Sequence, residues 1–122
     1  MALMDIALFH KGYFGYVDGR MRYLDGMETY IQGQDSDFWA VFEAEEQLRH
    51  FSYEMEDLAA LWYKSPAENV LEIALHQFLD DGDALEMVRI ARMHGHVELY
   101  VVHDEVDEGF PEAAYIDVGG IS

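Results

Sequence analysis

Apolar and polar residues follow two different periods along the chain, and these periods predict its secondary structure. The first third alternates in short runs separated by glycine turns, which is typical of antiparallel strands. Asp18-Gly19 has the chemistry of a tight hairpin turn, and Asp25-Gly26 turns the chain again. We therefore expect a β meander with strands at residues 4–9, 13–17, 21–24 and 27–31, followed by a loop at 32–36.

A helical period follows and predicts the main helix of the fold, at residues 38–51. Asp37 is placed to cap it, and Glu45 and Arg49 have the spacing of an i, i+4 ion pair. Trp39 lies off the main apolar stripe of this helix, so we expect it to be partly exposed. The stripe consists of Phe38, Val41, Phe42, Leu48 and Phe51.

The second half of the chain predicts two more strands and a second, short helix. Residues 58–63 read as a buried strand that Ser65-Pro66 stops. Residues 68–78 have helical spacing at Leu71, Ala74, Leu75 and Phe78, and two interpretations stay open: a helix, or a helical turn leading into an extended piece. Gly95 suits the left-handed residue that ends a helix. Residues 97–102 are apolar on both faces, which indicates an interior strand.

The short helix before Gly95 starts in a group of carboxylates. Asp80, Asp81 and Asp83 are interrupted by Gly82, where we expect the backbone to turn. Asp83 and Glu86 have the spacing of a capping box, in which two side chains reciprocally bind the amides at a helix start. Their negative charges also lie at the positive end of the helix dipole.

The order of these elements is that of an α+β, ubiquitin-like β-grasp. In this fold a mixed sheet wraps one main helix, and here a short second helix is added; a ferredoxin-like α+β sandwich is the alternative. We expect one domain at residues 1–103. Residues 104–122 hold six carboxylates and no Lys or Arg, so we expect an acidic tail or linker there.

Composition narrows the classes of function. The chain of 122 residues has 25 acidic and 7 basic residues, a formal net charge of −18. Such a surface repels nucleic acids and anionic membranes and favours basic protein partners. Cysteine is absent, which excludes disulfides and thiolate chemistry and fits an intracellular protein. The sequence shows neither a signal peptide nor a membrane-spanning run, and nothing in it requires a cofactor.

Five motifs resemble the amino-terminal domain of plant Mutator-like transposases and of proteins derived from them. That domain is similar to the Phox-and-Bem-type interaction domain, which is itself a ubiquitin-like β-grasp. The resemblance covers roughly residues 4 to 105. The motifs are Phe9-His10-Lys11-Gly12-Tyr13-Phe14, Tyr23-Leu24-Asp25-Gly26-Met27, Leu61-Trp62-Tyr63-Lys64-Ser65-Pro66, Asp83-Ala84-Leu85-Glu86-Met87-Val88 and Val97-Glu98-Leu99-Tyr100-Val101.

The resemblance implies a non-catalytic module for protein–protein interaction. In the wider family an acidic loop-and-helix face on one domain docks onto a lysine of the first strand of another. This implies self-association, or docking onto a different protein with a basic surface. The transposase likeness also implies a nuclear location. The matching residues are Asp80, Asp81, Asp83 and Glu86 for the acidic face, and Lys11, Arg20 and Arg22 for the basic side.

Two other classes of function stay open. Clustered carboxylates would suit a small hydrolase or a metal-dependent enzyme, but the acidic group is too short for a calcium loop. His94, His96, His103 and Glu98 lack further metal-ligand spacing. An acidic mimic of nucleic acid is the other possibility, since its charge would occupy basic surfaces. The histidines His10, His50 and His76 read as ordinary polar ends of secondary-structure elements.

Overall fold

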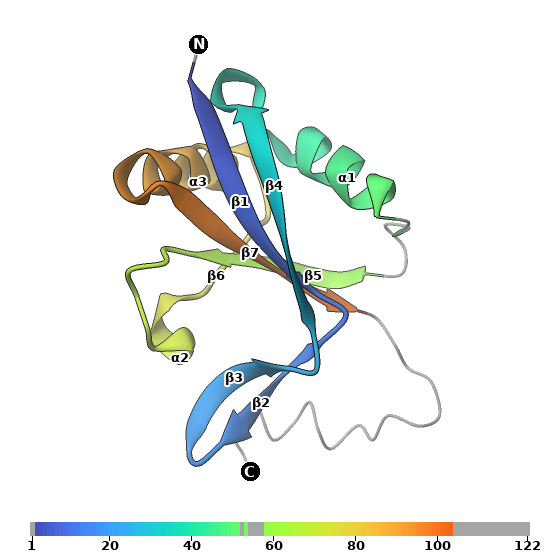
Figure 1. Cartoon of the computed structure of the whole chain (residues 1–122), viewed down its shortest axis with the longest axis vertical. Helices are drawn as coiled ribbons and strands as arrows, with labels where there is room; N and C mark the ends of the chain where they lie inside the picture. Colours follow the sequence, from blue (N-terminus) through green and yellow to red (C-terminus); the bar gives the residue numbers. More distant parts are fainter. Residues whose placement is uncertain (1, 52, 54–57, 104–122) are drawn as a thin grey trace.

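A five-stranded mixed sheet forms the centre of the molecule in the computed structural model, which describes residues 2–51, 53 and 58–103. The first and last strands, β1 and β7, lie side by side and run parallel, while the other neighbours are antiparallel. This arrangement is the ubiquitin-like β-grasp that the sequence predicts (Figure 1). The order across the sheet is β4 (Met27–Asp35), β1 (Leu3–His10), β7 (His96–His103), β5 (Leu58–Lys64) and β6 (His76–Gln77).

The predicted β meander is wrong, although its four strands are present. β1 pairs with β4, with Ile6 opposite Ile31, because both strands turn apolar side chains into the core. The strands between them, β2 (Tyr13–Val17) and β3 (Arg20–Leu24), form a separate hairpin that projects from one end of the sheet (Figure 1). At its tip Asp18 and Gly19 both have positive φ, as the predicted tight turn requires.

Two helices cover one face of the sheet and close the core. These are α1 (Val41–His50) and α3 (Asp81–His94), while the short α2 (Leu71–Ala74) lies near the hairpin (Figure 1). The 3₁₀ helix η1 (Ser36–Phe38) precedes α1. The largest fully buried side chains come from both layers: Ile6, Leu8, Leu48, Met87, Val97, Leu99 and Val101. Because β7 lies between β1 and β5, its prediction as an interior strand is confirmed.

The predicted main helix is the smaller of the two. It starts at Val41 because η1 intervenes, and this shift turns Trp39 inward to 5% exposure instead of leaving it partly exposed. Phe38 and Phe42 of the predicted stripe are 70% and 62% exposed, and Ala44 and Leu48 are the buried residues of α1. The structure also extends β4 through the predicted loop, and Arg49 pairs with Glu46, not Glu45, at 2.9 Å.

The second half of the chain contains the other features that the sequence predicts, in α2, in α3 and at the end of the chain. Residues 68–78 contain a helical turn, α2, and then the short strand β6, which is the second of the two alternatives that the sequence left open. Gly95 ends α3 with φ of 93°, so its role as the left-handed cap is confirmed. The predicted acidic tail at residues 104–122 lies outside the described residues.

Candidate functional site

The acidic face lies at the start of α3, and two of its members, Asp80 and Asp83, are tied together by a capping box. The amide of Asp83 donates to Oδ1 of Asp80 at 3.1 Å, and the amide of Asp80 donates to Oδ2 of Asp83 at 3.1 Å. The box predicted for Asp83 and Glu86 is therefore wrong by three residues. Gly82 lies inside the first helical turn and not in a turn before it, because the helix already begins at Asp81.

Asp83 carries the most hydrogen bonds of the group. Its carboxylate also accepts from the amide of Leu79 at 2.8 Å and from the hydroxyl of Tyr63 at 3.1 Å. The Leu79 amide, with further donors from Asp80 and Tyr63, holds the pKa of Asp83 below its usual value. Burial and the neighbouring Asp83 raise the pKa of Tyr63 above its usual range. This carboxylate is therefore held in one orientation.

The other two carboxylates have their own partners. Oδ1 of Asp81 accepts from the amide of Val41 at 3.0 Å, and so supplies the cap that Ala40, the N-cap residue of α1, lacks. Glu86 accepts from Arg89, at 3.1 Å for the Nε–Oε1 contact, and this partner lowers the pKa of Glu86. Asp80 and Asp81 are exposed, and Asp83 and Glu86 are half-buried. The structure thus brings all four predicted residues together in the first two turns of α3.

Exposed apolar side chains lie beside these carboxylates. Leu79 precedes the helix and is 67% exposed, and Leu85 follows Asp81 by one turn and is 68% exposed. Phe42 is the neighbour of Val41, whose amide binds Asp81. An exposed aromatic beside the acids is thus provided by Phe42 and not by Trp39. Acidic and apolar groups occur together at this end of α3.

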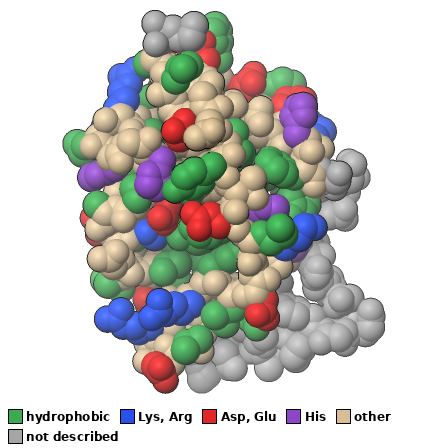
Figure 2. All heavy atoms as spheres, viewed as in Figure 1, with side chains coloured by type: hydrophobic (Ala, Val, Ile, Leu, Met, Phe, Trp, Pro, Cys, Tyr) green, Lys and Arg blue, Asp and Glu red, His purple; other side chains and the backbone are tan. Residues whose placement is uncertain are grey.

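The predicted basic side is divided between the two ends of the β2/β3 hairpin. Lys11 lies at its base, with φ of 69°, and its Nζ lies 5.3 Å from the centre of the Tyr53 ring. The backbone amide of Lys11 donates to Nε2 of His103 at 2.8 Å. Arg20 and Arg22 lie on β3 towards the tip, and both are exposed. Figure 2 shows Lys and Arg side chains gathered over the hairpin. The structure therefore groups the two arginines but does not place Lys11 with them.

The hairpin is fixed to the sheet by aromatic residues and close backbone contacts. The hydroxyl of Tyr23 accepts from the amide of Gly12 at 3.0 Å and donates to the carbonyl of Val101 at 2.7 Å. Burial raises the pKa of Tyr23 to about 12. The ring of Tyr100 stacks on Phe9 with centroids 4.6 Å apart and also meets Phe14 and Tyr23. The base of the hairpin is therefore part of the folded core, and its tip extends beyond it.

The structure contains a buried ion pair, Lys64–Glu98, that the sequence did not predict. Lys64 is 5% exposed, and its Nζ lies 2.7 Å from Oε1 of Glu98 on the adjacent strand. The same nitrogen donates to the carbonyl of Glu68 at 2.7 Å, and the hydroxyl of Tyr100 donates to Glu98 at 2.8 Å. The only sign of this pair in the sequence is that Lys64 directly follows the apolar run at residues 58–63. Because both charges are paired, we assign this group to the fold.

Two of the histidines, His10 and His103, make hydrogen bonds within the fold. His10, expected at an ordinary polar strand end, is 3% exposed and bonds to the hydroxyl of Tyr53 and, at 3.0 Å, to that of Thr29. Burial lowers the pKa values of His10 and His103. Within residues 2–51, 53 and 58–103, no three His, Asp or Glu side chains are grouped so that they could hold a metal ion. No helix in that part is long and apolar enough to cross a membrane.

Comparison with known protein families agrees with the fold. A family model described as the PB1-like domain matches residues 1–103. The chain belongs to the PB1-like family. Domains of this family are generally modules for protein–protein interaction and are typically non-catalytic. No curated protein and no solved structure matches the chain.

Proposed function

We propose that this PB1-like domain docks onto a basic surface of another protein molecule through the acidic face Asp80, Asp81, Asp83 and Glu86. The observation that carries the proposal is the close grouping of these carboxylates on the first two turns of α3, each with a hydrogen bond that fixes it. Fixed acceptors lose little side-chain entropy when a partner binds. Glu86 shares its charge with Arg89, so the three aspartates contribute most of the field.

The apolar side chains beside the acidic face indicate that the partner surface is apolar as well as basic. Leu79, Leu85 and Phe42 are exposed next to the carboxylates. Interfaces generally bury apolar anchors at their centre and place charges around them. The expected partner surface therefore carries lysine or arginine around one or two apolar side chains. A second copy of this chain offers Arg20 and Arg22 for such contact, with Lys11 set apart from them.

The test removes charge without removing the hydrogen bonds. Asp80→Asn/Asp81→Asn/Glu86→Gln takes away three negative charges and leaves a side-chain oxygen at each position, and Asn is as good a helix cap as Asp. Glu28→Gln/Asp37→Asn/Glu68→Gln removes the same number of charges at other exposed residues. The probe is a synthetic helical peptide of lysine and leucine, titrated by calorimetry at low and moderate salt, with self-association followed by sedimentation.

Only the difference between the two variants is informative, because a chain of net charge −18 attracts any cationic peptide. We expect the acidic-face variant to lose at least tenfold more affinity than the control variant, about 1.4 kcal/mol. Equal losses in the two variants would contradict docking at this face. They would instead agree with an acidic mimic, whose charge acts over the whole surface.

A further inference from the structure

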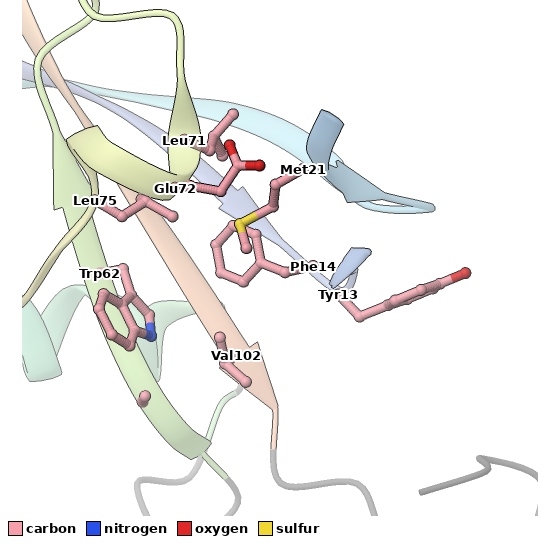
Figure 3. A pocket seen from close by; sticks show the side chains of 9 residues that line it. Tyr13, Phe14, Met21, Trp62, Leu71, Glu72, Leu75 and Val102 are labelled. Carbon is pink, nitrogen blue, oxygen red and sulfur yellow. The ribbon is translucent and has the colours of Figure 1, made fainter. Parts of the chain in front are cut away.

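An apolar pocket of about 410 Å³ lies on the face of the sheet turned away from α1 and α3. Val97, Leu99 and Val101 of β7 point into the core under the helices, so the alternation of the strand points Val102 to this other face. Figure 3 shows the hairpin and α2 side chains facing Trp62 across the pocket. The main lining residues are Phe14, Met21, Trp62, Leu71, Leu75 and Val102.

A smaller pocket of about 180 Å³ adjoins the first and has a different chemical character. The two share Met21, Leu71 and Glu72, so they are continuous along β3 and α2. Arg20 and Arg22 line the smaller one. Within the described residues, neither guanidinium makes a hydrogen bond or ion pair. The combined surface offers apolar contacts at one end and two cations at the other, and this fits an acidic segment that also carries large apolar side chains.

The chain itself contains a segment of that composition at residues 104–122. It holds six carboxylates and no Lys or Arg, and its apolar residues include Phe110, Tyr115 and Ile116. It begins two residues after Val102, which lines the pocket. The eight residues from there to Phe110 span up to about 26 Å when extended. The segment is therefore long enough to enter the larger pocket, which Val102 itself lines, and to continue along it.

We propose that residues 104–122 bind back onto this surface, with apolar side chains in the larger pocket and carboxylates against Arg20 and Arg22. An acidic ligand supplied from outside meets repulsion from a chain of net charge −18. A tethered segment overcomes that repulsion because its effective concentration is in the millimolar range. This proposal does not depend on the acidic face. If both proposals hold, a second copy can use Arg20 and Arg22 only after the tail has left them.

The experiment measures proximity in the full chain. Since the sequence has no cysteine, Gly119→Cys accepts a single nitroxide label. With methionine methyl groups labelled with ¹³C, Met21 reports on the pocket, and Met93, 64% exposed on α3, serves as the reference. We expect the nitroxide to remove most of the Met21 methyl signal and to leave the Met93 signal unchanged. Equal broadening of the two signals, or none, would overturn the proposal.

Two controls separate the remaining explanations. Arg20→Glu/Arg22→Glu should restore the Met21 signal, whereas Arg89→Glu/Arg92→Glu, with the same charge change on α3, should not. Loss of Met21 signal that persists after reversal of Arg20 and Arg22 would overturn the charge pairing and with it the proposal. A mixture of isotope-labelled chain without nitroxide and unlabelled chain with nitroxide should show no broadening. Broadening in that mixture would assign the pocket to a second copy and overturn binding within one chain.

Discussion

The acidic face of α3 and the β2/β3 hairpin carry opposite charges, and their charged side chains are held in different ways. Asp80, Asp81 and Asp83 each accept hydrogen bonds that cap a helix. Arg20 and Arg22 belong to a two-stranded ribbon whose base, not its tip, is built into the core. We therefore expect charge reversal on α3 to lower stability as well as to weaken the proposed docking, and charge reversal at the hairpin tip to leave stability nearly unchanged.

The largest effect is expected at the base of the hairpin, for Gly12→Ala. An added Cβ would lie 2.4 Å from the carbonyl oxygen of Leu24 and 2.8 Å from the backbone of Gly26. Backbone cannot rotate away as a side chain does, so the hairpin must shift, and we expect a loss of about 3 kcal/mol in the free energy of unfolding. Urea unfolding followed by circular dichroism measures it.

Gly15→Ala is the matched control in the middle of β2. There the added Cβ meets Cδ1 of Leu24 at 2.9 Å, the movable end of a side chain. We expect the smaller loss for Gly15→Ala. If both variants lose the same stability, the base of the hairpin is no more rigid than its middle, and the contrast with the acidic face disappears.

The next effect concerns α3, for Asp83→Ala. This change removes the acceptor of the Leu79 and Asp80 amides and of the Tyr63 hydroxyl. Loss of the Asp83 half of the capping box, together with the Tyr63 hydroxyl left unpaired, predicts about 2 kcal/mol lower stability. Arg20→Ala/Arg22→Ala should leave the urea midpoint nearly unchanged, since neither side chain has a protein partner among the described residues. Equal losses in the two variants would contradict the proposed difference between the regions.

Much of the fold could be predicted from local sequence, because each correct feature depends on nearby residues. β7 is apolar on both faces, Gly95 is the left-handed cap, and Asp18-Gly19 makes the hairpin turn. The pairing of β1 with β4 was missed since it depends on which strands share the core, which the order of turns does not state. For the same reason the sequence could not show that Lys64 and Glu98 meet across two strands.

The candidate site could be located by sequence but not assigned in detail. Asp80–Asp83 has the same spacing as the predicted Asp83–Glu86 box, but the Leu79 and Tyr63 donors that fold against Asp83 could not be read from the sequence. Trp39 was misplaced because η1 rotates the chain before α1, and a short 3₁₀ turn has no clear sequence period. Arg20 and Arg22 both lie on β3, while Lys11 precedes β2 at the other end of the hairpin, a separation that depends on the pairing of the two strands.

The smallest expected effect is a change in how stability depends on pH, measured with Asp83→Asn. The folded-state pKa of Asp83 is lowered by the amide of Leu79 and further donors, so it lies below the unfolded value of about 3.9. The stabilisation is complete above that unfolded value and is lost as pH falls through the folded one. Asn does not titrate, so the urea midpoint of the variant should decrease less than that of the wild type between about pH 5 and pH 2.

Glu86 also titrates with a lowered pKa, but it does so in both proteins. Parallel curves would mean that the hydrogen bonds to Asp83 do not favour its charged form, and the acidic face would then lack the fixed carboxylate on which its contrast with the hairpin depends.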